Sequence, residues 1–417
     1  MSKKLKILIA ILSIAILSVP IGVVTMDKLA PKDKIYEGIY INETNVGNLS
    51  AKEATEKVTK QYNNELQNKS INAIYKDFSY VIDYKSLNAR YDIDAAVKSA
   101  MDYGKGGNPF TRTITRFKVK NKPIKIELKF LADDTRIKED VKAISKKIDQ
   151  KAKDATISYT GSFNVTEGKD GLKVNQEKLE KDLKKAINPE KKEEVVEIPV
   201  DVVKPKITAS MLKEIDTKIQ SFSTEFNPSN PNRVGNIRVS SEAINGTVVL
   251  PGEVFSTNKA MGPRVKSSGY TEAPTIVNGT LVPGLGGGVC QVSSTLYNAA
   301  LLADLEIVER RPHSLRVSYV PASRDAVISG DYIDLKFKNT TGYPIYIGGY
   351  TSGSSVTMTI YGSSKAAKKD VKIISDVYQT IPKEGKTQTK SRAYRKVYDS
   401  NGKLIKEEKL SNDYYKG

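Results

Sequence analysis

A glycine-rich turn that runs directly into an apolar helical pattern constrains the fold of this chain more than any other feature. Residues 281–305 read LVPGLGGGVCQVSSTLYNAALLADL. The apolar side chains after the glycines recur at the spacing of one helix face, which predicts a core-facing helix that begins at about Cys290. The residues with this spacing are Val292, Leu296, Ala299, Ala300 and Leu302. The sequence therefore predicts a buried helix whose first turn carries Cys290.

Cys290 is the only cysteine of the 417 residues, so an intrachain disulfide is excluded and a single free thiol needs an explanation. Free N–H groups and the macrodipole at a helix N-terminus stabilise an anion and lower the pKa of a thiol. The preceding Gly286–Gly288 lets the backbone approach a substrate, and N–H groups near Cys290 would form an oxyanion hole. A reactive cysteine is one interpretation, and a buried inert thiol is the other.

His313, the only histidine, follows 23 residues after Cys290 in the run ERRPHS of residues 309–314. The predicted helix and a return strand would bring His313 back beside the start of the helix. Imidazole is the usual base for a cysteine nucleophile near neutral pH. A zinc site is disfavoured because one cysteine and one histidine leave about half of a four-ligand set unassigned. No lysine of a phosphate-binding loop follows the glycines. The sequence thus predicts neither a metal nor another cofactor.

A second constraint is the apolar segment Leu5–Met26, whose only charged residue is Lys6. Its length is close to the ~20 residues that a helix needs to cross a bilayer, so we predict a single transmembrane helix. Lysines precede the segment, which favours a cytoplasmic N-terminus and places the bulk of this single-pass protein outside the cell membrane. A cleaved signal peptide is the alternative, but no A-x-A-like site closes the apolar run.

The formal net charge of +18 attracts the chain to polyanions. Nucleic acid is excluded as a partner because aromatic-rich RNA-binding signatures, zinc-finger spacings and a helical basic region are all missing. Anionic lipid headgroups and the anionic polymers of a cell wall are the partners that fit the predicted membrane anchor.

The remaining patterns predict an α+β fold class made of several parts. Ser50–Glu53 has the form of a capping box and predicts the start of a helix. Residues 74–101 and 157–187 each predict two strands and then a helix, which indicates a duplicated α+β module. The predicted parts are 1–34 (cytoplasmic tip, transmembrane anchor and spacer), 35–118 and 119–208 (the two modules), 209–234 (linker), 235–362 (a mixed α+β domain that contains the cysteine) and 363–417 (a basic β extension with a hairpin turn at Asn401–Gly402).

Ordered motifs run through the cysteine-containing domain. They are PGEVFS at 251–256, GPR at 262–264, GY at 269–270, AP at 273–274, GGGVCQ at 286–291, STLYNAA at 294–300, RPHS at 311–314, YVP at 319–321 and RDA at 324–326. In these motifs the domain resembles the VanW family, over about residues 235–362. The duplicated region resembles the peptidoglycan-binding modules that often precede such a domain. The resemblance implies a link to glycopeptide resistance, and some members of the family are L,D-transpeptidases.

The resemblance further implies that Cys290 attacks the third residue of a peptidoglycan tetrapeptide stem and releases D-Ala. An acceptor amine would then resolve the acyl-enzyme and leave a 3-3 cross-link, with His313 moving the protons. Candidate carboxylate-binding residues are Arg264, Arg311 and Arg324; candidate oxyanion or peptide donors are Gly287, Gly288, Gln291 and Ser314; candidates that orient the imidazole are Asp325 and Glu309. Arginine and aspartate in such motifs are as often structural ion pairs.

Two other functions stay open on the sequence. A non-catalytic peptidoglycan-binding protein of the envelope would bury Cys290 as an unreactive thiol. A cysteine peptidase or amidase would use the same residues with water as the acceptor, so only its products would distinguish it. The duplicated modules could also be a plain spacer that binds no glycan.

Overall fold

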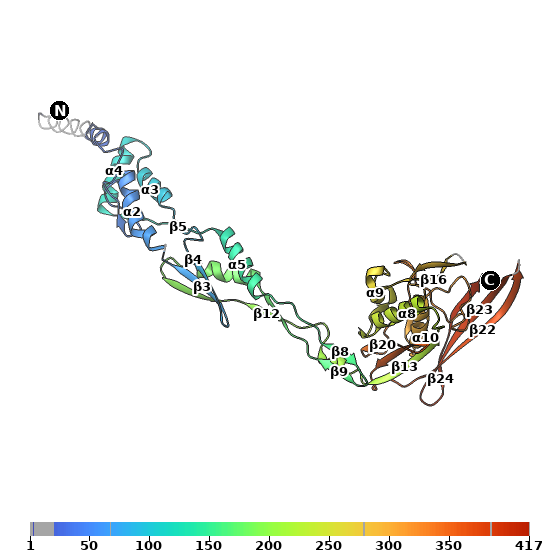
Figure 1. Cartoon of the computed structure of the whole chain (residues 1–417). Helices are drawn as coiled ribbons and strands as arrows, with labels where there is room; N and C mark the ends of the chain where they lie inside the picture. The colour runs from blue at the N-terminus through green and yellow to red at the C-terminus, as the bar shows by residue number, and fades with distance from the viewer. Residues whose placement is uncertain (1–2, 4–20, 67, 278–279, 384–385, 417) are drawn as a thin grey trace. The chain divides into compact units, whose positions relative to one another are not determined.

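The computed structural model describes residue 3 and residues 21–66, 68–277, 280–383 and 386–416 (Figure 1). Its fold is mixed α+β, which confirms that part of the predicted fold class. The chain divides into two compact units. The first unit comprises Met1–Lys151 and Gly171–Val203, and the second comprises Ala152–Asp170 and Lys204–Gly417.

We predicted a transmembrane helix and, with it, a single-pass membrane protein anchored through its N-terminus. The helices that the structure describes show that this prediction is wrong. None of these helices combines the length and the apolar character that a bilayer span requires. Most of the predicted segment, residues 5–20, lies outside the described residues. Residues 21–28 are helical, and most of their side chains are exposed.

The first unit has two cores, and one of them forms around the capping-box helix. The N–H of Ser50 donates to the carboxylate of Glu53 at 2.8 Å, and α2 (Ala51–Leu66) begins directly after Ser50, as predicted. The other elements at this core are β1 (Ile39–Ile41), β2 (Thr44–Asn45), α3 (Ile93–Asp102), α4 (Pro109–Asn121) and β6 (Ile124–Ile126). In its sheet β1 lies between β2 and β6. Helix α4 crosses the boundary that we predicted between the two modules, at residues 118 and 119.

The second core of this unit combines segments from both predicted modules. Strands β3 and β4 share a sheet with β11, in the order β11-β3-β4, and α5 and α6 contribute buried side chains to the same core. The elements are β3 (Ser70–Tyr75), β4 (Phe78–Asp83), β5 (Arg90–Tyr91), β7 (Phe130–Leu131), α5 (Asp134–Ile148), β10 (Gly171–Val174), α6 (Gln176–Ala186), β11 (Glu193–Glu197) and β12 (Val200–Val203). The division into two duplicated modules therefore stays a prediction.

A four-stranded antiparallel sheet carries the core of the second unit. Its strand order is β13-β21-β20-β14, and α8 and α10 pack against it (Figure 1). The elements are β13 (Thr217–Glu225), α8 (Pro231–Ile244), β14 (Thr247–Val249), α10 (Val289–Leu302), β20 (Ile345–Ser352) and β21 (Ser355–Gly362). Residues 209–234, predicted as a linker, contain α7 (Ala209–Leu212), β13 and the start of α8. Strand β13 belongs to the core because it pairs with β21 along almost its whole length.

Shorter elements of the second unit surround the sheet. They are β8 (Thr156–Tyr159), β9 (Phe163–Thr166), β15 (Val254–Ser256), α9 (Thr257–Met261), the 3-10 turn η1 (Lys266–Ser268), β16 (Glu272–Val277), β17 (Thr280–Leu285), β18 (Glu306–Glu309) and β19 (Lys336–Lys338). The β8–β9 hairpin packs through aromatic rings: the ring centroids of Tyr159 and Tyr361 are 4.8 Å apart, and those of Phe163 and Tyr346 are 5.9 Å apart. The hairpin thereby becomes part of the second unit.

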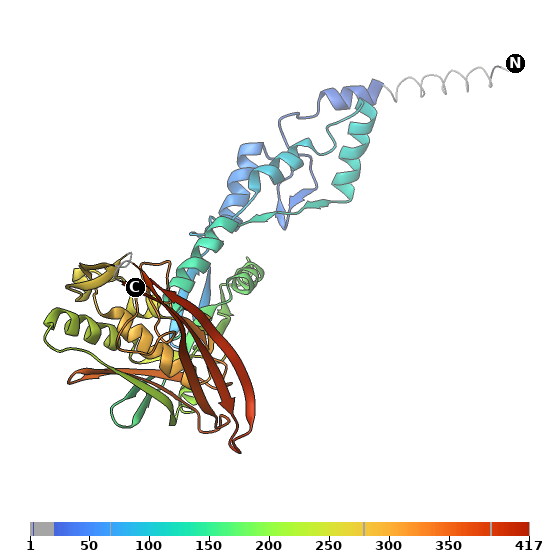
Figure 2. The ribbon, with the colours of Figure 1, turned by 90° about the vertical axis from the view of Figure 1, so that its right-hand side faces the viewer.

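The C-terminal residues form a three-stranded antiparallel sheet of β22 (Asp370–Lys383), β23 (Lys386–Tyr398) and β24 (Leu404–Tyr415). Figure 2 shows these three long strands in red, running side by side. The hairpin turn predicted at Asn401–Gly402 is confirmed. Buried Arg395 of β23 donates to the carbonyl oxygen of Leu305 at 2.8 Å, just beyond the end of α10. The sheet therefore packs against the helix that carries Cys290.

Candidate active site

Cys290 lies on the first turn of α10, as the sequence predicted, and its side chain is partly exposed. The residue before the helix, Gly288, has a φ of 110°, in the left-handed region that favours glycine. A Cβ on Gly287 would lie 2.6 Å from the carbonyl of Ala273, which is too close for any other residue. The glycines thus let the turn pack directly against β16, and this packing positions the start of the helix.

A cavity of about 630 Å³ opens beside the thiol. It is lined by the glycine turn, by both strands of the β16–β17 hairpin and by the segment 327–331. The side chains that bring chemistry to its wall are Cys290, His313, Arg233, Arg264 and Tyr319. Its volume lies in the range typical of small-ligand sites, so a substrate can reach the sulfur.

Cys290, His313 and Asp325 lie in sequence, with the imidazole between the sulfur and the carboxylate. The thiol and the imidazole are close enough to shift each other's pKa, and Sγ of Cys290 donates to the carbonyl oxygen of Ile328 at 3.5 Å. On the other side of the ring, Nδ1 of His313 lies 2.6 Å from Oδ2 of Asp325, and the backbone N–H of His313 donates to the same oxygen at 2.6 Å. The order of nucleophile, imidazole and carboxylate is that of a hydrolase or acyltransferase triad.

The electrostatics of the site favour a thiolate and an imidazolium. Burial by itself raises the pKa of Cys290, but the neighbouring imidazole of His313 and the positive charge of Arg264 outweigh it, so the pKa is lowered. Burial lowers the pKa of His313, but its hydrogen bond to Asp325 and the neighbouring sulfur of Cys290 raise it to about 9. Both shifts favour transfer of the thiol proton to the imidazole.

Buried partners hold the Asp325 carboxylate in place. Burial raises the pKa of Asp325, but the hydrogen bond from His313 and the charge of Arg310 lower it to about 2. Arg310 pairs with Oδ1 of Asp325 at 3.0 Å and with Asp413 of β24 at 2.7 Å. The hydroxyl of Tyr415 donates to Oδ1 of Asp325 at 2.6 Å. The C-terminal sheet thus contributes two of the side chains behind the triad.

The site residues that we predicted besides Cys290 and His313 lie in different parts of the domain. Of the two candidates for orienting the imidazole, Asp325 contacts His313, whereas Glu309 pairs with Lys336 at 2.9 Å. Buried Gln291 accepts from Arg233 at 2.6 Å and donates to the carbonyl oxygen of Glu225 at 2.8 Å. Its side chain therefore links α10 to its neighbours.

The predicted arginines and Ser314 also lie in different places relative to the cavity. Arg264 lines the cavity. Arg311 is exposed, and the cavity wall does not include it. Arg324 donates to Oδ1 of Asn298 at 2.6 Å, so it supports α10 from behind. Ser314 is partly buried, and its carbonyl oxygen accepts from the N–H of Lys416 at 2.7 Å.

Sequence reasoning missed three residues of the site: Arg233, Arg310 and Tyr319. Arg310 stands directly beside the RPHS motif, but its partner Asp413 is about a hundred residues away in the chain. Burial and the charge of Cys290 raise the pKa of Tyr319, so its hydroxyl stays protonated and can donate a hydrogen bond. Tyr319 is the first residue of the YVP motif, and this motif was the signal in the sequence that could have indicated Tyr319 as a site residue.

The model of the family described as "VanW like protein" matches residues 232–361, the stretch that holds the glycine turn, Cys290, His313 and Asp325. The chain carries a VanW-like domain. A second family model, described as "Putative peptidoglycan binding domain", matches residues 80–196. The VanW-like domain and the peptidoglycan-binding domain together indicate a cell-wall-associated protein.

Two relatives share part of this chain. The protein YoaR of Bacillus subtilis (strain 168) is 42% identical over 190 residues, which cover 45% of this chain and 62% of the relative. The vancomycin B-type resistance protein VanW of Enterococcus faecalis (strain ATCC 700802 / V583) is 32% identical over 145 residues, which cover 33% of this chain and 53% of the relative. The chain thus spans between about half and two thirds of these relatives. No solved structure matches it.

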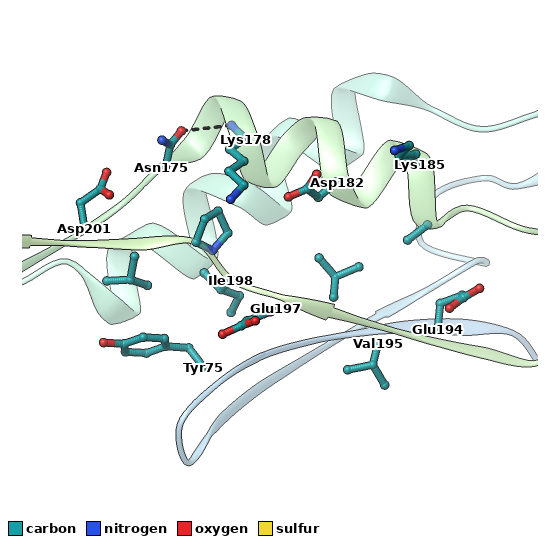
Figure 3. A pocket seen from close by; sticks show the side chains of 14 residues that line it. Tyr75, Asn175, Lys178, Asp182, Lys185, Glu194, Val195, Glu197, Ile198 and Asp201 are labelled. Atoms are coloured by element: carbon teal, nitrogen blue, oxygen red, sulfur yellow. Dashed lines mark hydrogen bonds between the residues drawn. The ribbon is translucent and has the colours of Figure 1, made fainter.

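A second cavity, of about 760 Å³, lies in the first unit, between α6 and the β11–β12 segment (Figure 3). Lys178 and Asp182 of α6 line it, Glu194 and Glu197 of β11 line it as well, and Tyr75 lies at one end. Both signs of charge therefore line this groove, which falls partly within the match to the peptidoglycan-binding domain.

Proposed function

We propose that the VanW-like domain is a cysteine acyltransferase of the cell wall, an L,D-transpeptidase that forms 3-3 cross-links through an acyl-enzyme on Cys290. The observation that carries the proposal is that Cys290 and His313 share the wall of a cavity while Asp325 holds the His313 ring at 2.6 Å. A thiol with a lowered pKa beside an oriented imidazole is the arrangement of a cysteine nucleophile and its base.

The first half-reaction uses the thiolate of Cys290 and the imidazolium of His313. The sulfur attacks the carbonyl carbon of the donor stem, and a C–S bond forms as the C–N bond to the terminal residue breaks. His313 gives its proton to the leaving amine, which departs as D-Ala. The negative oxygen of the tetrahedral intermediate lies near the glycine turn, where N–H groups of Gly287 and Gly288 are the candidate donors.

The second half-reaction returns the enzyme to its starting state. The side-chain amine of an acceptor stem attacks the thioester, and neutral His313 takes the proton that this amine loses. The C–S bond breaks, and the thiolate leaves beside the regenerated imidazolium. Asp325 keeps the ring oriented through both steps.

The choice of peptidoglycan as substrate rests on the second domain and on one relative. Residues 80–196 match the model described as "Putative peptidoglycan binding domain", and the Enterococcus faecalis relative is named as a vancomycin resistance protein. We extend a role in glycopeptide resistance to this chain as part of the proposal, because 3-3 cross-links do not use the D-Ala-D-Ala end of the stem.

The test is incubation of the protein with a disaccharide-tetrapeptide, followed by mass analysis of the products. We expect dimers that are lighter than two substrates by one alanine residue plus water, together with free D-Ala. Cys290→Ala should form neither product and should stay folded by circular dichroism. Tripeptide without dimers would point to a peptidase, and unchanged substrate with both proteins would contradict catalysis.

A second candidate function, non-catalytic peptidoglycan binding, is favoured by the groove between α6 and β11. Its carboxylates and lysines can exchange hydrogen bonds with the hydroxyls, amides and charged ends of a glycan with stem peptides. In sedimentation with purified peptidoglycan, the double variant Asp182→Asn, Glu197→Gln should bind less. The control is Asp77→Asn, which changes an exposed side chain outside the groove. Equal binding by the control and the double variant would show that the groove does not bind peptidoglycan.

A further inference from the structure

Two arginines flank the glycine turn beside Cys290. A Cβ at Gly288 would lie 3.0 Å from Cγ of Arg233, and a Cβ at Gly286 would lie 3.7 Å from Cβ of Arg264. Arg233 belongs to the first turn of α8, and Arg264 follows α9. Both side chains line the cavity that holds the thiol. The stems of two arginine side chains therefore contact the turn that positions the sulfur, and both residues line the cavity.

Among the described residues, the acceptors of the hydrogen bonds that these two arginine side chains donate are uncharged groups. Arg233 donates to Oε1 of Gln291 at 2.6 Å. Arg264 donates to Oδ1 of Asn258 at 2.9 Å and to the carbonyl oxygen of Gly330 at 2.8 Å. A guanidinium has five N–H groups, so both arginines keep donors for a ligand.

Arg310, in the same domain, differs from these two arginines because its partners are charged. It is buried and forms ion pairs with two carboxylates, those of Asp325 and Asp413. Among the described residues, no ion pair involves Arg233 or Arg264 within the same distance limit. Burial lowers the pKa of Arg233, since its charge is withdrawn from water without an anion beside it. Asp331 also lines the cavity, but its side chain is exposed to solvent.

We infer that Arg233 and Arg264 together bind a free carboxylate of the acyl donor, close to the carbonyl that Cys290 attacks. This inference rests on the proposed function and narrows its substrate class to peptides that carry such a carboxylate. The planar guanidinium fork matches a carboxylate in two parallel hydrogen bonds. An amide at the same position offers one neutral oxygen and brings N–H donors that face two cations. The site therefore discriminates acid from amide.

The same two cations could attract a phosphate of an anionic wall polymer, but the geometry favours the carboxylate. The arginines line the same cavity as Cys290, so their ligand must belong to a molecule that also brings a carbonyl group to the sulfur. A stem peptide brings its carboxylate a fixed distance from the carbonyl under attack. Competition by inorganic phosphate separates the two ligands.

The experiment measures binding to the full chain carrying Cys290→Ala, so that no turnover occurs. One ligand is a disaccharide-tetrapeptide with a free terminal carboxylate, and the other is the same compound with a terminal amide. We expect the acid to bind about 10- to 100-fold more tightly than the amide, the range of charge-assisted hydrogen bonds. Arg233→Gln and Arg264→Gln, each in this background, should weaken binding of the acid and leave the amide almost unchanged.

Arg238→Gln is the matched control, because Arg238 lies on the same helix α8, is exposed and pairs with Glu242. Arg233→Lys keeps the charge, so it serves if Arg233→Gln does not fold; it should retain part of the preference. Equal affinity for acid and amide would overturn the inference, as would equal losses in Arg238→Gln or full competition by millimolar phosphate. The binding measurement does not depend on turnover, because Cys290→Ala cannot react. If wild-type protein forms no products, the proposed function fails, but the preference for acid over amide can still be measured.

Discussion

The hydroxyl of Tyr415 donates a hydrogen bond of 2.6 Å to Oδ1 of Asp325, the carboxylate that orients His313. Tyr415 lies near the end of β24, outside residues 232–361 that match the VanW family. The same hydroxyl accepts from the N–H of Ser323 at 2.8 Å. The last strand of the chain is therefore part of the support of the triad, although the sequence indicated only an appendage.

Removal of this hydroxyl should destabilise the fold. Tyr415→Phe leaves a buried carboxylate with one donor fewer and the N–H of Ser323 without its acceptor, so we expect a loss of about 1–3 kcal/mol in the free energy of unfolding. Tyr414→Phe is the control, because Tyr414 is 43% exposed on the same strand. Denaturant titration measures both variants, and equal stability of the two would contradict the role of Tyr415.

The thiol of Cys290 should react at a lower pH than an ordinary cysteine, because the pKa is lowered by His313 and Arg264. Alkylation by iodoacetamide should therefore already be fast near pH 7 and fall only in acid. In His313→Gln the positive charge beside the sulfur is lost while burial remains, so the pKa of Cys290 rises. We expect alkylation at pH 7 to slow by more than about tenfold. A variant that reacts as fast as wild type would exclude a thiolate–imidazolium pair.

Asp325 should make the fold sensitive to acid. Its pKa falls from 3.8 in the unfolded chain to about 2 in the folded one, so its stabilising effect is complete above about pH 4 and disappears as the pH falls through about 2. The difference in unfolding free energy between wild type and Asp325→Asn should shrink by about 2 kcal/mol over that range. Asp77→Asn, at an exposed site, should track wild type, and a constant difference for Asp325→Asn would refute the assignment.

A methyl group on the glycine turn should displace it. In Gly287→Ala the new Cβ would meet the carbonyls of Ala273 and Pro274 at 2.6–2.7 Å, and both are backbone groups that cannot move alone. We expect a loss of about 1–3 kcal/mol in stability and of most thiol reactivity. Gly235→Ala, in α8 with nothing within 4 Å of its Cβ, should instead stabilise by about 0.5–1 kcal/mol. The opposite ranking in thermal unfolding would show that the turn tolerates a side chain.

Local signals predicted the parts of the site that depend on neighbouring residues. The apolar spacing after the glycines located α10 and put Cys290 on its first turn, and the turn at Asn401–Gly402 located a hairpin of the C-terminal sheet. Short-range chemistry was sufficient for these two elements. We did not predict α5, although Ile137, Val141 and Ile144 have helical spacing and are buried.

Contacts between distant segments could not be predicted from the sequence. Strand β13 looked like a polar linker because its pairing partner, β21, lies more than a hundred residues away. The choice between Asp325 and Glu309 depended on where Lys336 and Arg310 would come to lie, which no local pattern encodes. The apolar composition of residues 5–26 predicted a membrane span that the described helices do not support.

The central claim, that Cys290 carries an acyl group during the reaction, is tested most directly by the intact mass of the protein. Wild-type protein mixed with disaccharide-tetrapeptide in the absence of an acceptor amine should gain the mass of the disaccharide-tripeptide acyl group, and peptide mapping should place it on Cys290. Cys290→Ala should gain nothing. An unmodified wild-type protein in the presence of released D-Ala, or an adduct on another residue, would contradict the account.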